Sequence, residues 1–298
     1  MEQIRHLAVL GGDQRQIYMT KGLMGEGYEL SVWGLGKCHE ALLGAEVCDT
    51  WERAIEKSDA VILPLPLSID GVRVHCPLHD GEAHLRVANL LDAISGKVML
   101  GGRISEPLYA LAEKKGVRPI DYYDCELLQQ KNAIPTAEGA IAIAMQALPI
   151  TIDRAEVAVL GYGRIGKLLS AKLSVLGAYV TVYARRREVL SEASLYHHKT
   201  ALLSKREGRA ALSSFPEGCR AVFNTIPERL IANDDLDVIP PDCLYVDLAS
   251  APGGIDHTAA AARGIKTVWG TALPGKCAPE TAGKIISEAI VMLLESLS

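Results

Sequence analysis

Short apolar runs alternate with amphipathic stretches along the chain, and the same order of elements occurs twice. Residues 7–33 align with residues 157–183 at a constant offset of 150 positions. Each copy has an apolar run, a glycine turn, an amphipathic stretch that stops at Gly27 or Gly177, and a second apolar run. This order is typical of the start of a βαβ unit. The repeat therefore predicts two α/β domains that open in the same way.

Later apolar runs predict the other strands, at 60–65, 98–101, 117–121, 221–225, 244–248 and 265–269. Helical patterns fall between and after them, at 81–94, 105–115, 256–263 and 279–297. Strands that alternate with helices favour parallel sheets whose two faces are covered. We predict an α/β fold of two Rossmann-like parallel-sheet domains, 1–148 and 149–298, with an interdomain cleft. The C-terminal stretch 279–298 is a candidate to pack back on the first domain.

The segment that joins the domains begins with Pro135-Thr136 and ends before Pro149. Threonine is a favourable N-cap residue, and proline ends helices. We therefore expect a connecting helix that opens at Thr136.

Composition sets the class of protein. The chain has 298 residues, a net charge of −5, 49% hydrophobic residues and 22% charged residues, as globular domains do. Its mild acidity disfavours nucleic-acid binding, and its apolar runs are shorter than the ~20 residues of a membrane helix. The polar start Met1–His6 is not typical of a signal peptide, and seven singly placed cysteines without a C-x-x-C favour a reducing, cytoplasmic setting.

A cluster at His75, Cys76, His79 and His84 raises the question of a metal site. Pro77 interrupts the helix that would align His75 with His79. We interpret the cluster as a polar loop and predict no metal.

The turn of the second copy reads Gly161-Tyr162-Gly163-Arg164-Ile165-Gly166 and lies between an apolar strand and a helix. This is the context in which G-x-G-x-x-G binds a dinucleotide. The first glycine makes the turn, the second admits the pyrophosphate, and the third packs the helix on the strand. The first copy has Asp13 and Gln16 at the second and third positions, so we predict that it binds no dinucleotide.

The end of the second strand indicates which dinucleotide binds. NAD sites usually have an acid there for the ribose hydroxyl. This chain has Ala184, Arg185, Arg186 and Arg187, with no acid before Glu188. Guanidinium groups bind phosphate through charge-assisted hydrogen bonds, so the pattern favours NADP(H) over a solvated basic turn.

Two further loops follow strands whose carboxyl ends should face the ligand. The first is Asn224-Thr225-Ile226-Pro227, and the second, Asp247–Gly254, contains Leu248, Ala249 and Ser250. Asn224, Thr225 and Ser250 are candidates to contact the ribose and carboxamide of nicotinamide. A turn for the first loop and a helix cap for the second are the structural alternatives.

These residues resemble the A-chain family of bacterial dipicolinate synthase. The resemblance spans the chain and depends on the glycine turn and several further runs, namely GGDQRQ at 11–16, NAIPTAEG at 132–139, NTIP at 224–227, DLASAPGG at 247–254, LPG at 273–275 and APETAG at 278–283. It implies NADP-dependent oxidation of dihydrodipicolinate, or of its hydroxy-tetrahydro precursor, to pyridine-2,6-dicarboxylate. The substrate would branch from the lysine pathway during spore formation. A flavoprotein-like B subunit is the implied partner, and homo-oligomerisation is left open.

A substrate with two carboxylates needs donors on more than one side. Arg15, at the start of the first domain's helix, and Thr136 are candidates to bind them, and Lys276 is a weaker candidate. Ser250 is a further candidate catalytic residue. Glu138 is a candidate base, or an acid that interacts with the helix dipole.

Two other functions fit the same plan. A D-2-hydroxyacid dehydrogenase needs a histidine–carboxylate pair, and after Asp247 the chain offers only His257. A non-catalytic NADPH-sensing subunit would need no dicarboxylate site.

Overall fold

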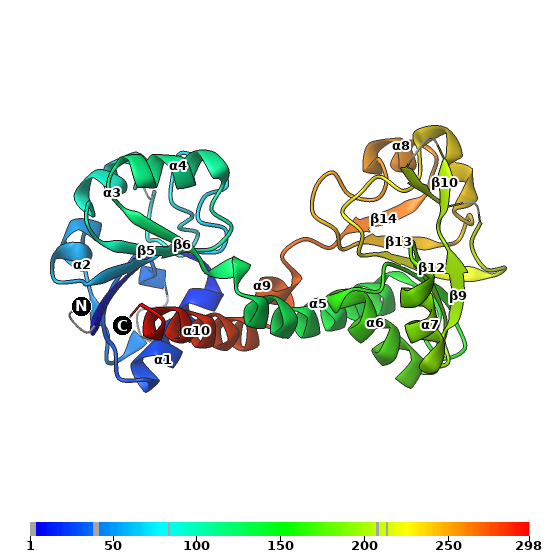
Figure 1. Ribbon diagram of the computed structural model, residues 1–298, viewed down its shortest axis with the longest axis horizontal. Coiled ribbons are helices and arrows are strands. Elements are labelled where there is room, and N and C mark those ends of the chain that lie inside the picture. Colours follow the sequence, from blue (N-terminus) through cyan, green and yellow to red (C-terminus); the bar gives the residue numbers. More distant parts are fainter. Residues whose placement is uncertain (1–3, 38–41, 83, 207–208, 213, 298) are drawn as a thin grey trace. The chain divides into compact units, whose positions relative to one another are not determined.

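The computed structural model describes residues 4–37, 42–82, 84–206, 209–212 and 214–297. It divides into two compact units (Figure 1). Unit 1 consists of Met1–Asn132 and Ala278–Ser298, and unit 2 of Ala133–Cys277.

The sheet of unit 1 has six parallel strands in the order β3-β2-β1-β4-β5-β6. Their bounds are β1 His6–Leu10, β2 Glu29–Trp33, β3 Glu46–Val47, β4 Ala60–Ile62, β5 Val98–Gly101 and β6 Arg118–Asp121. The helices of this unit are α1 Gln14–Gly25, α2 Trp51–Glu56, α3 Val87–Ala93, α4 Glu106–Lys114 and α10 Pro279–Glu295, with the 3₁₀ turn η2 at Tyr122–Asp124. This strand order is that of the dinucleotide-binding Rossmann fold.

Alternate strand residues of unit 1 point to opposite faces of the sheet. Leu7 and Val9 pack with apolar side chains of α1 and α10, whereas Ala8 and Leu10 pack with those of α2, α3 and α4 (Figure 1). Both faces are therefore buried, which explains why β1 is a continuous apolar run.

The sheet of unit 2 repeats this plan in the order β14-β13-β12-β7-β8-β9, again with every strand parallel. Its strands are β7 Glu156–Leu160, β8 Tyr179–Ala184, β9 Lys199–Leu202, β12 Cys219–Asn224, β13 Leu244–Asp247 and β14 Lys266–Trp269. The other elements are α6 Arg164–Val175, α7 Arg187–Leu195, α8 His257–Ala262, α9 Leu273–Cys277, the 3₁₀ helix η3 Asn233–Val238 and the antiparallel pair β10 Ser204–Arg206 and β11 Arg209–Ala211. The prediction of two Rossmann-like α/β domains is confirmed.

Several elements differ from the predicted ones at their ends. Helix α3 starts at Val87, not near residue 81, because the preceding backbone bridges to another segment: Val74 N donates to Leu85 O, and Arg73 pairs with Arg86. Strands β3 and β9 were not predicted, since they are short and their side chains are mostly exposed.

Helix α5 runs without a break from Glu126 to Ala147 and contains Pro135 in its interior. The predicted helix start at Thr136 is therefore wrong. Proline removes only one backbone hydrogen bond, and a helical stripe of buried residues continues past it, at Ala133, Ala137, Ala140, Ala144 and Leu148. The division between the units falls inside this helix, between Asn132 and Ala133, whereas the sequence suggested residue 148.

Helix α10 lies against α1 within unit 1 (Figure 1). Two glycines allow the close approach of the backbones. A Cβ on Gly283 would lie 2.4 Å from Arg15 O, and a Cβ on Gly22 would lie 2.3 Å from Ser287 Oγ. The C-terminal helix is thus part of the core of the first domain.

Candidate dinucleotide site

The glycine turn of unit 2 joins β7 to α6 and needs glycine at its two ends. Gly161 has a φ of +97°, and a Cβ there would lie 2.4 Å from Thr225 Oγ1. A Cβ on Gly166 would lie 2.2 Å from the backbone oxygen of Gly161. These two glycines therefore serve the packing of helix on strand.

Gly163 is different, because a Cβ there would meet no atom within 4 Å. It is exposed and precedes α6, whose N-terminus has no side-chain cap. An uncapped helix N-terminus beside an open glycine is the arrangement that accepts a phosphate. Arg164 is also exposed and Ile165 is half-buried. The turn thus fits the pyrophosphate of a dinucleotide.

The matching turn of unit 1 is filled by its own side chains. Gln16 is 1% exposed, and a Cβ on Gly12 would lie 2.4 Å from the Gln16 side chain. Asp13 caps α1, accepting a hydrogen bond from Arg15 N at 3.0 Å. These contacts support the prediction that only the second domain binds a dinucleotide.

The basic run lies at the carboxyl end of β8. Ala184 is buried, whereas Arg185, Arg186 and Arg187 are exposed. Arg185 Nη1 donates to Glu228 Oε2 at 2.9 Å. The arginines can thus reach a ligand, although one of them already has a carboxylate partner.

The loop after β12 has a more structural role than the sequence suggested. Asn224 is fully buried, and its side chain binds both backbone groups of Ile226 and donates to Asp247 Oδ1 at 2.9 Å. Thr225 Oγ1 donates to Leu160 O at 2.8 Å. Ile226 is buried and Pro227 is exposed. Of the three candidate contacts to the ribose and carboxamide, the two in this loop, Asn224 and Thr225, have side chains that hydrogen-bond within the protein.

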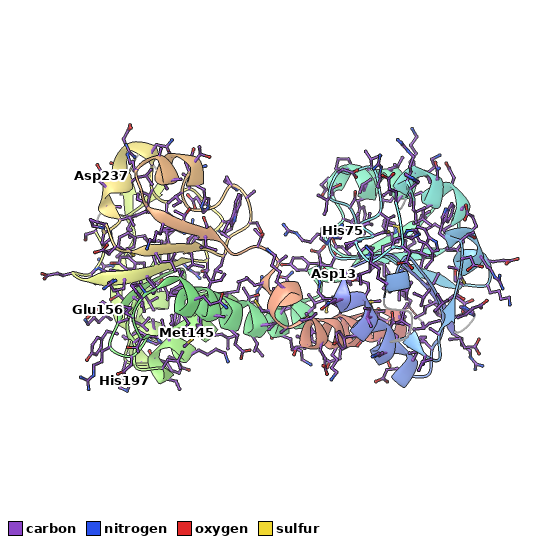
Figure 2. All side chains as sticks on the ribbon, turned by 180° about the vertical axis from the view of Figure 1, so that it is seen from behind. Asp13, His75, Met145, Glu156, His197 and Asp237 are labelled. Atoms are coloured by element: carbon purple, nitrogen blue, oxygen red, sulfur yellow. The ribbon has the colours of Figure 1, made fainter. Side chains whose placement is uncertain are left out.

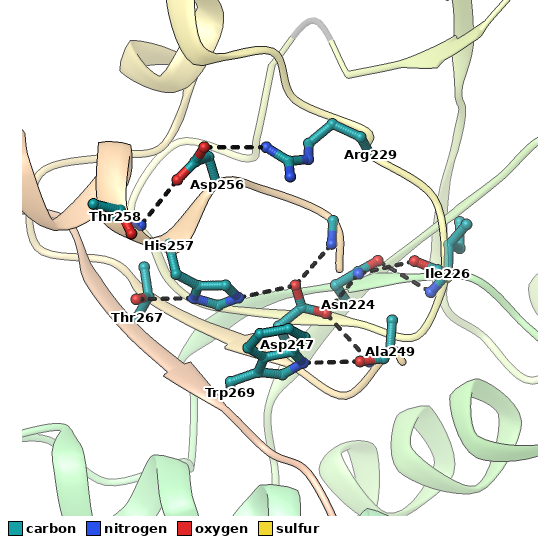
Figure 3. Close-up of polar contacts among 11 residues, drawn as sticks. Asn224, Ile226, Arg229, Asp247, Ala249, Asp256, His257, Thr258, Thr267 and Trp269 are labelled. Carbon is teal, nitrogen blue, oxygen red and sulfur yellow. Dashed lines mark hydrogen bonds and ion pairs between the residues drawn. The ribbon is translucent and has the colours of Figure 1, made fainter. Parts of the chain in front are cut away.

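Asp247, at the end of β13, is the centre of the polar network in Figure 3. Its side chain is 0% exposed. Oδ1 accepts hydrogen bonds from Asn224 Nδ2 and from Ala249 N at 3.2 Å, and Oδ2 accepts one from Gly254 N at 2.7 Å. One buried carboxylate therefore holds both carboxyl-edge loops in place and shapes the loop that carries Leu248, Ala249 and Ser250.

His257 completes this network, and sequence reasoning gave it no role in the fold. Its Nε2 lies 3.3 Å from Asp247 Oδ2, and its Nδ1 lies 3.1 Å from Thr267 Oγ1. The ring stacks on Trp269 with centroids 5.1 Å apart, and Trp269 Nε1 donates to Ala249 O (Figure 3). Both ring nitrogens are engaged, so His257 is a positioning residue. The signal available in the sequence was that His257 is the histidine that follows Asp247, the pair considered for a D-2-hydroxyacid dehydrogenase.

Close backbone approach explains the glycines of this loop. A Cβ on Gly254 would lie 2.4 Å from Tyr245 Oη. Burial, together with the charge of Asp247, raises the pKa of Tyr245 well above its usual value, so the phenol stays neutral. Ser250 and Pro252 are exposed at the surface of the loop. Both lie on the solvent-facing side of the loop that Asp247 holds.

Arg15, predicted to bind a substrate carboxylate, already binds a carboxylate of the protein. Its side chain is 6% exposed, and its Nη2 lies 2.8 Å from Asp13 Oδ2 and donates to Leu65 O. Asp13 and His75 lie on the same side of unit 1 (Figure 2), and burial lowers the pKa of His75. The Asp13–Arg15 pair therefore orders the start of α1.

The two candidates on α5 also lie elsewhere than predicted. Thr136 is inside the helix and 9% exposed, so it offers no helix N-terminus to a carboxylate. Glu138 Oε1 accepts a hydrogen bond from Lys172 Nζ at 2.8 Å, beside the C-terminal end of α6. That end lies opposite the glycine turn, so Glu138 does not join the other site residues of unit 2. The weaker candidate Lys276 is exposed on α9.

Metal ligands do not gather in the described part of the chain. It contains no group of three or more His, Cys, Asp or Glu side chains that could hold a metal ion. Within the same ranges, no helix has the length and apolar character needed to cross a membrane.

Two Rossmann sheets in one chain, one with an open glycine turn, define a two-domain protein of the fold found in dinucleotide-dependent dehydrogenases. The transhydrogenase of Sinorhizobium meliloti has this fold, with a TM-score of 0.69 and 16% identity over 97% of this chain and 94% of the other.

More similar proteins define the family. Residues 6–123 match the family model of the N-terminal domain of the dipicolinate synthase A-subunit. The dipicolinate synthase A-subunit of Bacillus subtilis (strain 168) is 30% identical over 98% of this chain and 96% of its own length. The crystal structure of the corresponding protein from Bacillus halodurans has a TM-score of 0.85 and 28% identity, covering 99% of both chains. The chain belongs to the dipicolinate synthase A-subunit family.

Proposed function

We propose that the chain is an NADP-dependent oxidoreductase that forms dipicolinate, pyridine-2,6-dicarboxylate, from dihydrodipicolinate. The observation that carries this proposal is the open turn at Gly163 within a chain of this family. The hydroxy-tetrahydro precursor is the alternative substrate form, and it would lose one water in addition. The proposed setting is the branch from the lysine pathway during spore formation, in the cytoplasm.

The reaction balances without a further reactant. One ring carbon loses a hydride and the ring loses one proton, while both carboxylates are retained and the product is an aromatic pyridine. Bound NADP⁺ would accept the hydride. Because aromaticity stabilises the product, the protein mainly has to orient the reacting atoms, which agrees with a site that is built from positioned loops.

Each part of the unit 2 site has a role in this proposal. Gly163 admits the pyrophosphate to the N-terminus of α6, and Arg185 and Arg186 bind the 2′-phosphate. Ser250, held on the Asp247 loop, contacts the nicotinamide end. Arg15 is buried against Asp13, Thr136 is buried within α5, and Glu138 binds Lys172 near the opposite end of α6, so none of the three is assigned a contact with the dinucleotide.

A direct assay tests the activity. Purified chain is mixed with dihydrodipicolinate and NADP⁺, with and without a flavoprotein-like B subunit, and the absorbance of the pyridine product is followed. We expect product with NADP⁺ and less with NAD⁺. Product formation without any dinucleotide dependence, or oxidation of a 2-hydroxy acid instead, would contradict the proposal. NADPH binding with no turnover in either arm would favour a sensing subunit.

Gly163→Ala tests the dinucleotide site. The methyl group would meet no protein atom, so the melting temperature should stay unchanged. It would enter the space of the pyrophosphate, so NADP⁺ affinity should fall by about 1–3 kcal/mol, comparable to an overpacked contact. Calorimetric titration measures the affinity. The control is Gly25→Ala, another exposed glycine with open space at its Cβ position and no left-handed φ, which should leave both the melting temperature and NADP⁺ binding unaltered.

Replacing Arg185 and Arg186 together with alanine tests the cofactor preference. Each charge-assisted hydrogen bond lost should cost about 1.5–3 kcal/mol, with values at the low end because both side chains are exposed. NAD⁺ affinity should change little, because NAD⁺ has no 2′-phosphate. Equal loss for both dinucleotides, or a wild type that prefers NAD⁺, would be evidence against NADP.

A further inference from the structure

The ion pair between Arg185 and Glu228 has a particular place in the sheet of unit 2. Arg185 directly follows β8, and Glu228 lies in the loop after β12. Strands β8 and β12 are the two neighbours of β7, which leads into the glycine turn. The pair, with Nη1 and Oε2 2.9 Å apart, therefore joins the carboxyl ends of the strands on either side of the dinucleotide turn.

The sequence has no acidic residue directly after β8, but the structure places the carboxylate of Glu228 at that position in space. In NAD sites such an acid accepts a hydrogen bond from the ribose hydroxyl. Here the carboxylate comes from the neighbouring loop, and in the structure it binds a guanidinium. Arg185 is 58% exposed and Glu228 is 37% exposed, so a ligand can reach both partners.

We infer that Glu228 is a specificity-determining residue that competes with the 2′-phosphate of NADP for Arg185. The inference rests on the proposed NADP site and adds Glu228, which has no role in the proposal above. A phosphate binding to Arg185 must displace the carboxylate or share the guanidinium with it, and it is repelled by that carboxylate. NAD carries no such phosphate, so the Arg185–Glu228 pair can stay formed when NAD binds. Glu228 would thereby lower the affinity for NADP and not that for NAD.

Glu228→Gln tests this competition, because glutamine keeps the shape and removes the charge. We expect NADP⁺ to bind about three- to tenfold more tightly, a moderate gain because the pair is exposed and screened by salt. NAD⁺ affinity should change less than about twofold. The same gain should appear with 2′,5′-ADP and be absent with 5′-ADP. Calorimetric titrations at about 0.05 and 0.5 M salt measure all four ligands, and high salt should reduce the gain.

Two further variants make the result specific. Glu217→Gln makes the same charge change before β12, at the opposite end of that strand, and should leave all affinities unaltered. In an Arg185→Ala background, Glu228→Gln should tighten NADP⁺ binding much less, since no guanidinium is left to release and only the direct repulsion between carboxylate and phosphate is relieved. A gain as large as in the wild-type background would overturn competition for Arg185 in favour of a general charge effect.

The outcomes separate the inference from the proposed function. A wild type that prefers NADP⁺, with Glu228→Gln unchanged, would overturn the inference and leave the proposed cofactor intact. A wild type that prefers NAD⁺, with Glu228→Gln still tightening 2′,5′-ADP, would support the inference and overturn the proposed cofactor. Weaker NAD⁺ binding by Glu228→Gln would show that the carboxylate holds the ribose, which also overturns the inference.

Discussion

Asp247→Ala should lower the free energy of unfolding by about 3–5 kcal/mol. The carboxylate is fully buried and accepts hydrogen bonds from Asn224, Ala249 and Gly254, with His257 also against it. Each buried donor left without a partner costs about 1–3 kcal/mol, and the losses in one network are not additive. Chemical denaturation of the full chain measures the change.

Conservative and control variants show whether the charge or the shape of Asp247 matters. Asp247→Asn keeps the shape but sets an NH₂ group against donors, so it should be destabilising to an intermediate degree. Asp237→Ala removes an exposed carboxylate from the same unit and should change stability by less than about 0.5 kcal/mol. If Asp247→Ala had the same free energy of unfolding as the wild type, the network in Figure 3 would not be what holds the two loops.

Arg15→Ala should also destabilise the protein, by about 2–4 kcal/mol. The guanidinium is almost fully buried between Asp13 and Leu65 O, so alanine leaves a void and a carboxylate without its partner. Removing one partner of a buried pair costs about 3–5 kcal/mol, and the partial exposure of Asp13 reduces this. Thermal and chemical unfolding are the measurements, with exposed Arg118→Ala as the control in the same unit.

The same variant distinguishes a structural from a substrate-binding role. If Arg15 bound a substrate carboxylate, its loss would raise the KM while the unfolding free energy stayed near that of the wild type. The structure predicts the opposite result: the free energy of unfolding should fall, and any change in KM should follow from that loss of stability. Arg15→Lys keeps the charge but not the fork that binds Asp13 and should lie between wild type and alanine.

The strands of both cores could be predicted because both faces of each parallel sheet are covered. Val157–Leu160 and Ala60–Ile62 are apolar without interruption, and the structure buries all of them. The edge strand β9 carries no such signal, because its mostly exposed positions accept polar residues. The path of α5 through Pro135 was also hidden, since packing along one side of a long helix outweighs one lost hydrogen bond.

The candidate site was predictable where backbone geometry dictates the residue type. Gly161 and Gly166 have no space for a side chain, so the pattern marks the turn itself. Polar residues are less informative, because a buried turn and a ligand contact both use asparagine. Asn224 follows a strand end as a ribose ligand would, yet its partners are Ile226 and Asp247. Likewise, a guanidinium such as Arg15 binds whichever carboxylate is nearest, and the sequence did not reveal that Asp13 is that carboxylate.

The placement of α10 affects the order in which the molecule can form during translation. Unit 2 is continuous in the chain, so all of its residues have been synthesised once Cys277 is added. Unit 1 lacks the helix that covers α1 until residues 279–295 follow. The amino-terminal domain, although synthesised first, is therefore completed last, and it exposes the apolar face of α1 until α10 has been added. The nascent amino-terminal half is the part that would need a chaperone's protection.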